Sequence, residues 1–190
     1  MTDKEFVEGL KKGDENIFRA FVEQQQHRLL RLCMGFVHNQ EDAKDLVQDV
    51  FIEVIRSVSG FREDSGLSTW LYRIAVNKSL NYLRKSKRIF KNLIQINASN
   101  IDADIEYASV SDIPDKSIET RQRENLIRSA IDTLQKNQRI AFILNKYENL
   151  SYKDISEIMN VSLSSVESLI HRAKVNLQKK LYNSYRKNLL

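Results

Sequence analysis

The chain has 190 residues, a net charge of +5 and a pI of about 9.2, with 42% hydrophobic and 29% charged residues. This length suits one domain or two small ones, and the composition is that of a folded globular chain and not of a disordered one. Five glycines and one proline leave few residues for the tight turns that join β-strands. Because hydrophobic residues also recur at helical spacing through most of the chain, we predict an all-α fold.

The sequence argues against several classes of protein and site. No stretch approaches the roughly 20 apolar residues of a membrane span, and the N-terminus lacks a signal-peptide core, so we expect a cytoplasmic protein. The single cysteine, Cys33, lies among leucines and is expected in the core, and one cysteine alone excludes a disulfide framework or a Cys/His zinc site. The histidines His27, His38 and His171 are scattered and no glycine-rich phosphate loop occurs, so we expect no catalytic site, metal or cofactor.

Charge is unevenly distributed and suggests a division of the chain. Residues 1–88 carry 15 Lys and Arg against 13 Asp and Glu, residues 89–116 carry 2 against 5, and residues 117–190 carry 13 against 7. The middle stretch also loses helical periodicity and is rich in Asn, Ser and Asp. We therefore predict two small helical domains, 1–88 and 117–190, joined by a flexible acidic linker at 89–116, with the basic domains suited to polyanionic partners.

Two helices are expected ahead of residue 40. Phe6, Val7 and Leu10 mark a short first helix. Asp14 is the expected N-cap of a longer second helix. The apolar residues of that helix are Ile17, Phe18, Phe21, Val22, Leu29, Leu32, Cys33, Phe36 and Val37.

The next helix, predicted for residues 40–58, begins with the sequence QEDAKDLVQDVFIEV, which has a carboxylate at every fourth position: Glu41, Asp45, Asp49 and Glu53. Like charges at this spacing destabilise an isolated helix by a few tenths of a kcal/mol per pair. An apolar stripe lies beside them, made of Ala43, Leu46, Val47, Val50, Phe51 and Val54. The acidic ridge is therefore either a solvated face or a surface for a basic partner. Its one-sided spacing without histidine argues against a metal site.

A fourth helix is predicted from Ser68 to about Arg88, after the polar loop GFREDSG. Two apolar sectors flank a polar ridge on this helix, which consists of Arg73, Asn77, Asn81, Arg84 and Arg88. The aromatic residues Phe61, Trp70 and Tyr72 lie beside the ridge. Cations interleaved with aromatic side chains are typical of surfaces that bind unpaired bases. Each aromatic residue taken alone is more typical of a core position.

The second module is also expected to be helical. Its predicted core residues are Ile127, Ile131, Leu134, Ile140, Phe142, Ile143 and Leu144. In residues 149–181, Ser151 and Asp154 form a capping-box pattern for a short helix that ends at Met159. Asn160 suits the left-handed conformation of a tight turn, and Ser162 is the expected cap of a longer helix. Short helix, tight turn and long helix together predict a helix-turn-helix.

The long helix has two distinct faces. Its inward residues are predicted to be Val166, Leu169, Ile170, Ala173 and Leu177, and its solvent-facing residues Ser164, Glu167, Ser168, His171, Arg172 and Lys174. Small hydroxyls at the start and cations further along suit a helix that contacts base edges in the major groove and then phosphates. A helical hairpin with a solvated polar face is the alternative.

Three of these segments resemble a family, the bacterial extracytoplasmic-function (ECF) sigma factors, which contain only the second and fourth sigma domains. EDAKDLVQDVFIEV resembles the helix that docks on RNA polymerase core, and FREDSGLSTWLYRIAVNKSLNYLRKSKR resembles the loop and helix that recognise and open the minus-ten element. LQKNQRIAFILNKYENLSYKDISEIMNVSLSSVESLIHRAKVNL resembles the helix-turn-helix domain for the minus-thirty-five element. The resemblance covers nearly the whole chain except the linker.

The resemblance implies three sets of site residues. Contacts with core polymerase are expected from Asp42, Asp45, Leu46, Gln48, Asp49, Phe51 and Glu53, with Leu46, Val50 and Phe51 divided between that contact and the core. Contacts with the minus-ten element are expected from Phe61, Arg62, Asp64, Ser65, Trp70, Arg73, Asn77, Asn81, Arg84, Lys85 and Arg88. Contacts with the minus-thirty-five element are expected from Ser162, Ser164, Ser165, Glu167, Ser168, His171, Arg172 and Lys174.

The resemblance also implies partners. They are bacterial RNA polymerase core, promoter DNA and an anti-sigma factor, which is often membrane-anchored in this group, whereas no small-molecule substrate is implied. The acidic linker would suit the polymerase channel for nascent RNA. The chain departs from many relatives at Gln135, where they have proline, and at Glu167 and Leu169, where they carry basic residues. Glu167 either accepts a hydrogen bond from a cytosine amino group or repels phosphate.

Three other functions account for the sequence less well. A transcription regulator that binds duplex DNA without joining polymerase would account for the helix-turn-helix but not for the acidic ridge. A small helical enzyme lacks any recognisable site, and a module that only binds proteins, such as a sigma-sequestering factor, is disfavoured by the cationic helix ends. We therefore expect a sigma factor that binds core polymerase, directs it to promoters and helps to open the minus-ten element.

Overall fold

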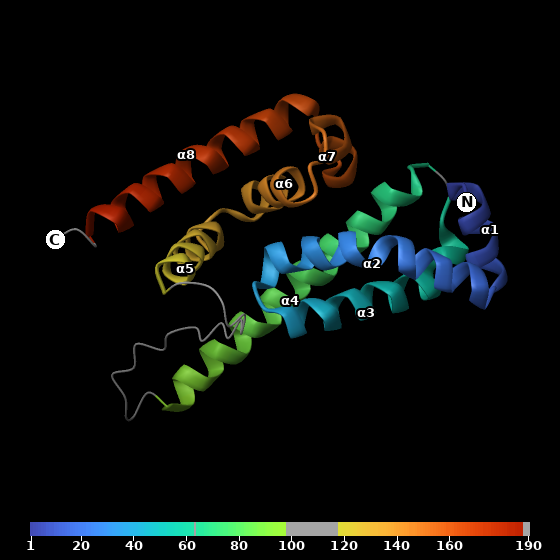
Figure 1. Cartoon of the computed structure of the whole chain (residues 1–190), viewed down its shortest axis with the longest axis horizontal. Helices are drawn as coiled ribbons and strands as arrows, with labels where there is room; N and C mark the ends of the chain where they lie inside the picture. Colours follow the sequence, from blue (N-terminus) through green and yellow to red (C-terminus); the bar gives the residue numbers. More distant parts are fainter. Residues whose placement is uncertain (63, 98–117, 188–190) are drawn as a thin grey trace. The chain divides into compact units, whose positions relative to one another are not determined.

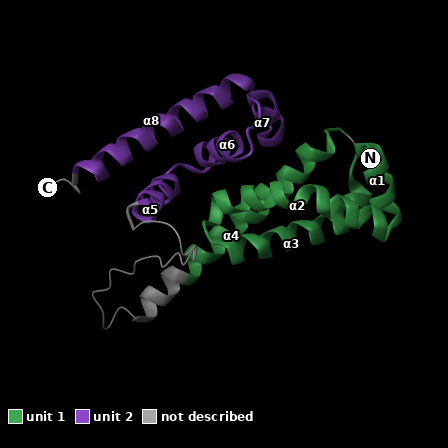
Figure 2. Ribbon diagram, in the orientation of Figure 1, with its two compact units in different colours: residues 1–111 green, residues 112–190 purple. Residues whose placement is uncertain are grey.

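The computed structural model describes residues 1–62, 64–97 and 118–187, all helices and short connections (Figure 1). Contacts divide the chain into two compact units, residues 1–111 and 112–190 (Figure 2). The sequence prediction of an all-α protein with a helix-turn-helix in its second part is confirmed. Most of the predicted linker, from residue 98 to residue 116, lies outside the described residues.

The first unit contains α1 (Asp3–Lys12), α2 (Glu15–Val37), α3 (Gln40–Ser57), a 3-10 turn η1 (Val58–Gly60) and α4 (Leu67–Asn97). Local hydrogen bonds begin and end these helices. Thr2 and Glu5 form a capping box at α1, and Gly13 ends that helix in the left-handed conformation with a φ of 71°. Asp14 caps α2 as predicted, accepting from the backbone N–H of Asn16 and Ile17.

The core of the first unit lies between α2, α3 and α4, with α1 closing one end. Phe21 is fully buried and contacts two other rings edge-on, with centroid distances of 5.5 Å to Phe6 and 6.2 Å to Phe51. Cys33 is buried as predicted and accepts a hydrogen bond from the buried Ser79 hydroxyl of α4, with 3.9 Å between the oxygen and the sulfur.

Helix α4 is longer than predicted. The sequence prediction ended it at about Arg88, whereas the helix continues to Asn97. The intervening residues contain neither glycine nor proline, so nothing in them stops an existing helix from propagating. A loss of amphipathic periodicity therefore did not mark the end of the helix.

The second unit contains α5 (Ile118–Asp132), α6 (Lys136–Tyr147), α7 (Tyr152–Met159) and α8 (Leu163–Lys187). Helix α8 packs against the other three. Five of the seven predicted core residues are buried, and Phe142 is half-buried, but Ile127 is 48% exposed. Ile127 has the right spacing for the core but lies before the part of α5 that is buried, which begins at Ala130.

The contact of α1 with α2 depends on Gly9. A Cβ atom at this position would lie 2.6 Å from both γ carbons of Ile17. We predict that Gly9→Ala lowers the free energy of unfolding by about 1–2 kcal/mol, because overpacking costs more than the helix propensity that alanine adds. Urea unfolding followed by circular dichroism measures this change.

Two variants separate the steric cause from a general effect of losing glycine. Gly60 has no atom within 4 Å of an added Cβ, so Gly60→Ala should change stability by no more than about 0.5 kcal/mol. In the double variant Gly9→Ala/Ile17→Ala, the loss should be smaller than the sum of the two single losses. Strict additivity would contradict the proposed clash.

Candidate partner and nucleic-acid interfaces

The carboxylates of α3 divide into two groups according to their neighbours. Glu53 pairs with Lys78 of α4, with 2.9 Å between Oε2 and Nζ. Asp42 forms a hydrogen bond with the Tyr82 hydroxyl, also on α4. These two carboxylates lie at the edge of α3 that packs against α4, and they hold the two helices in one rotational register.

The ionisation of these groups reflects the contact between the helices. The hydrogen bond from Lys78, and then its positive charge, lowers the pKa of Glu53 below its usual 4.5. Burial raises the pKa of Tyr82 to about 12, and the hydrogen bond with Asp42 acts in the same direction. At neutral pH Glu53 is therefore ionised and Tyr82 is protonated, as the two contacts require.

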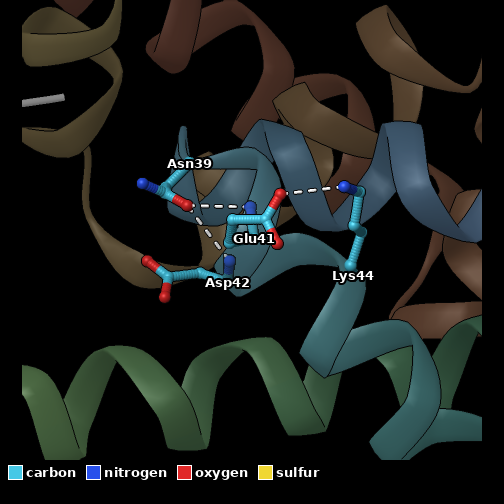
Figure 3. Close-up of polar contacts among 4 residues, drawn as sticks. All are labelled: Asn39, Glu41, Asp42 and Lys44. Carbon is cyan, nitrogen blue, oxygen red and sulfur yellow. Dashed lines mark hydrogen bonds and ion pairs between the residues drawn. The ribbon is translucent and has the colours of Figure 1, made fainter. Parts of the chain in front are cut away.

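Asn39 organises the start of α3 (Figure 3). Its side-chain oxygen accepts from the backbone N–H of Glu41 at 2.9 Å and of Asp42 at 3.1 Å. Glu41 extends away from Asp42 and pairs with Lys44 at 2.8 Å. Two acidic groups in the first turn also interact favourably with the helix dipole.

The solvent face of α3 carries the remaining carboxylates, Asp45 and Asp49, together with the exposed Gln48. Two large apolar side chains share this face: Ile52 is 45% exposed and Ile55 is 56% exposed. We call these five residues the α3 solvent face. Neither isoleucine was among the predicted contact residues, although their positions outside the apolar stripe indicate exposure.

Leu46 and Phe51 belong to the core of the first unit. They are 3% and 7% exposed, and Val50 is fully buried, so all three lie in the core in the free chain. The Phe51 ring packs edge-on against Phe18 and Phe21. A direct contact of Leu46 or Phe51 with a partner stays a prediction.

The loop that leads into α4 is fastened from two sides. The Lys11 ammonium of α1 donates to the Phe61 carbonyl at 3.0 Å. The Phe61 ring is buried and lies 5.0 Å from the half-buried Trp70 ring, centroid to centroid. Arg62 and Asp64 are exposed, and Ser65 is half-buried. The buried Phe61 ring therefore anchors the loop to the core. The sequence alone could not tell this buried position from an exposed one.

The polar ridge of α4 faces solvent on the first unit. Asn77, Asn81, Arg84, Lys85 and Arg88 are exposed, and Arg73 is half-buried. The ridge is partly ordered by its own contacts, since the Arg84 guanidinium donates to the Asn81 side-chain oxygen at 2.6 Å. Tyr72 turns inward and is 5% exposed, so only Trp70 of the three predicted aromatic residues remains partly accessible.

A hollow of about 360 Å³ lies where the acidic helix meets the basic ridge. Its lining comes from Leu46 and Asp49 of α3 and from Lys78, Asn81, Tyr82, Arg84 and Lys85 of α4. The first unit thus has an acidic helix face and a basic helix face side by side, separated by this hollow.

The helix-turn-helix of the second unit forms by the local contacts that the sequence predicts. The Ser151 hydroxyl accepts from the Asp154 backbone N–H at 3.2 Å, and Asp154 returns the contact by accepting from the Ser151 N–H at 3.1 Å. Asn160 ends α7 in the left-handed conformation with a φ of 53°. The Ser162 hydroxyl accepts from the Ser165 backbone N–H at 3.2 Å and so caps α8.

Burial fixes which side of α8 faces solvent. Val166 and Ala173 are fully buried and Ile170 is 1% exposed, whereas all six predicted solvent-facing residues are exposed. The Asn176 amide donates to the Gln138 side-chain oxygen at 2.9 Å and ties α8 to α6. The Ser162 hydroxyl lies 2.8 Å from the hydroxyl of Ser165 and 3.1 Å from that of Ser164, so all three interact within the cap, while Ser164 and Ser168 are exposed to solvent.

The described residues hold no group of three or more His, Cys, Asp or Glu side chains arranged to bind a metal ion. Within the same ranges, no helix is both long enough and apolar enough to cross a membrane.

An all-α chain with a cationic ridge on its first unit and a helix-turn-helix in its second has the features of a two-part DNA-binding transcription factor. Two family models match it in these parts: Sigma-70 region 2 over residues 21–89, and Sigma-70, region 4 over residues 124–177.

Curated relatives match over nearly their whole length. The ECF RNA polymerase sigma-E factor of Haemophilus influenzae is 34% identical over 183 residues, which is 95% of this chain and 96% of the relative. The RNA polymerase sigma-H factor of Pseudomonas aeruginosa is 32% identical over 181 residues, 94% of this chain and 93% of the relative.

The chain therefore belongs to the ECF group of RNA polymerase sigma factors. Solved structures share its fold. CnrH, in complex with the cytosolic domain of CnrY, has a TM-score of 0.69 at 19% identity, covering 96% of this chain and 99% of CnrH. The sigma factor RpoE of Bartonella quintana, in complex with the anti-sigma factor NepR, has a TM-score of 0.62 at 24% identity, covering 87% of this chain and 96% of RpoE.

The ion pair between α3 and α4 gives a prediction about acid stability. Because the pKa of Glu53 is lowered in the folded state, this pair stabilises the fold above pH 4.5 and the contribution is lost as the pH falls through the lower folded value. We predict that Lys78→Met raises the pKa of Glu53 toward 4.5, measured by NMR titration of its side-chain carboxyl carbon.

Lys44→Met is the matched control, because it removes the partner of Glu41 on the same helix. The pKa of Glu53 should stay at its wild-type value in that variant. An unchanged Glu53 pKa in Lys78→Met would show that the pair does not form in solution.

Proposed function

We propose that the α3 solvent face is the surface by which this sigma factor docks on core RNA polymerase. The observation that carries the proposal is the division of the acidic ridge: Glu53 and Asp42 are engaged by α4, while Asp45 and Asp49 face solvent beside two exposed isoleucines. A chain with net charge +5 keeps a local acidic and apolar surface here, which suits a basic partner with an apolar centre.

The polar ridge of α4 and the loop that precedes it are proposed to bind the minus-ten element as single-stranded DNA. Asn77 and Asn81 offer donors and acceptors to base edges, and Arg84, Lys85 and Arg88 offer charge to phosphates. The exposed polar residues Arg62 and Asp64 stand on a loop held by Lys11 and Phe61, as a pocket for an extruded base requires. Extrusion of a base costs a few kcal/mol, so contacts with polymerase must supply part of that free energy.

The second unit is proposed to bind the minus-thirty-five element as duplex DNA through α8. The solvent-facing side of this helix carries small hydroxyls in its first turns and cations further along. In a helix-turn-helix the early residues of the second helix contact base edges and later residues contact the backbone. Ser164 and Ser168 are thus assigned to bases, and Arg172 and Lys174 to phosphates, with His171 between them.

The partners of the chain follow from these surfaces. We propose that it acts as a non-catalytic subunit that directs polymerase to promoters, and that an anti-sigma factor holds it inactive by covering one of these faces. The sigma factor RpoE, which has the same fold, has been solved with the anti-sigma factor NepR, and CnrH, also of this fold, has been solved with the cytosolic domain of CnrY.

The docking surface is tested by reversing its charge. We predict that Asp45→Lys/Asp49→Lys abolishes co-elution of the chain with bacterial RNA polymerase core on size exclusion. Both side chains are exposed, so the variant should unfold at nearly the wild-type urea concentration.

The matched control, Glu8→Lys/Glu23→Lys, makes the same change of charge at two exposed positions on α1 and α2. It should co-elute like the wild type. Normal holoenzyme formation by the α3 variant would refute the docking proposal. A wild-type chain that binds duplex DNA but never joins the core would indicate a regulator that acts without polymerase.

The phosphate contacts of α8 are tested by the salt dependence of promoter binding by the holoenzyme. Removing Arg172 and Lys174 together should weaken binding and lower the slope of log affinity against log salt by about 2, because each phosphate contact contributes about 1. Lys180→Ala is the control, since this exposed lysine lies about 160° around α8 from Ser164. An unchanged slope in the double variant would exclude the proposed face.

A further inference from the structure

The first turn of α8 presents an apolar side chain to solvent. Leu163 is the first residue of the helix and is 49% exposed, directly after the capping serine Ser162. Val166, three residues further along, is fully buried and packs this end of the helix against the rest of the unit. The fold therefore does not use the outer part of the Leu163 side chain.

The exposed side of the first turns is also without a cation. From Leu163 to His171 the helix carries no lysine or arginine, and the first cation, Arg172, lies about 13 Å further along the axis. Bidentate contact of arginine or lysine with guanine is the commonest base-specific contact in the major groove. The part of α8 that would lie deepest in the groove cannot make it.

The groups that this part of α8 does present favour pyrimidines. An apolar side chain contacts the C5-methyl group of thymine, and a carboxylate accepts from the N4 amino group of cytosine. Glu167 is exposed, and among the described residues its carboxylate makes no hydrogen bond or ion pair. Glu167 follows Leu163 by one helical turn, so the two side chains project from neighbouring positions on one side of the helix.

We propose that Leu163 and Glu167 set the sequence preference of the minus-thirty-five element, with Leu163 packed on a thymine methyl group and Glu167 accepting from a cytosine amino group. This proposal rests on the proposed binding of duplex DNA by α8. Four residues of helix rise by about 6 Å, and base pairs are about 3.4 Å apart, so the thymine and the cytosine lie about two base steps from each other.

The charges around the two residues are consistent with this position. Arg172 and Lys174 lie about 160° apart around the helix, on opposite flanks of the side that carries Ser164, Ser168 and His171, and so can each contact one wall of the groove, with Glu167 about 20° from the Lys174 flank. These cations hold the helix in the groove in spite of the negative charge of Glu167. Opposite a base without an amino group the carboxylate would lose its water without gaining a donor, which penalises such a base.

The test uses holoenzyme assembled from bacterial core polymerase and the full chain. A duplex library with a randomised 40-bp segment is selected for binding, first with the wild type and then with Leu163→Ala and with Glu167→Ala. The wild type should select a minus-thirty-five motif with a thymine and a cytosine about two steps apart. Leu163→Ala should lose the preference for thymine alone, and Glu167→Ala the preference for cytosine alone.

Deoxyuridine in place of the selected thymidine removes only the methyl group. This replacement should weaken binding of the wild-type holoenzyme about fourfold, the effect of burying one methyl-sized group, and should leave binding of Leu163→Ala unchanged. Leu163→Met keeps an apolar side chain of similar size and should restore the dependence on the methyl group.

The outcomes separate this proposal from the function on which it rests. Wild-type holoenzyme that selects a clear promoter but binds the deoxyuridine form equally well would overturn the role of Leu163 and leave the sigma function intact. If the wild type selects no cytosine, or if Glu167→Ala selects the same cytosine as the wild type, the role of Glu167 would be overturned. Failure of the wild-type holoenzyme to select any promoter would overturn the proposed binding of DNA itself.

Discussion

The packing of α3 against α2 and α4 sets both proposed binding faces of the first unit. Ala43, Val50 and Val54 are fully buried, so the opposite side of α3 must face solvent whatever charges it carries. Where α3 meets α4, Glu53 is matched by Lys78, and Asp42 is matched by Tyr82. The same contacts turn Lys78 and Tyr82 toward α3, and the helical period then turns the Asn77, Asn81 and Arg84 ridge outward. One packing arrangement therefore orients the acidic face and the basic ridge together.

In the second unit, contacts between helices likewise determine which side of α8 faces solvent. The buried side of α8 is completed by a side-chain hydrogen bond from Asn176 to Gln138, and α6 is in turn joined to α5 by the ion pair of the buried Arg139 with Asp132, 2.6 Å between Nη2 and Oδ1. Such contacts have a directional geometry that apolar packing lacks, so they fix rotation about the helix axis. A helix that distinguishes base pairs needs this precision, since a small rotation would move every side chain to a different base.

The sequence predicted best those features that depend on a few neighbouring residues. The Asp14 cap, the capping box of Ser151 and Asp154, and the left-handed Asn160 are each closed within about one helical turn, and all three are present. Features that depend on a distant segment were missed or misjudged. Phe51 is enclosed by rings of α2, and the Phe61 loop is held by Lys11 of α1, fifty positions earlier in the chain. Periodicity shows that a residue has an apolar side, but only the fold shows which helix covers it, and for Ile127 none of the described residues covers it fully.

Three exposed apolar side chains, Ile52, Ile55 and Leu163, lie on the surfaces that are proposed to bind polymerase and promoter. Burying a side chain of this size is worth about 1.5–3 kcal/mol, and the free chain forgoes part of that stabilisation at each position. If the surfaces bind as proposed, the same free energy is gained only when polymerase and promoter cover them. Extruding a base from the minus-ten element costs a few kcal/mol, which is similar to the free energy of burying one or two such side chains. On this proposal, the free energy that helps to open DNA becomes available only when these side chains are buried in the holoenzyme, and the free chain does not have it.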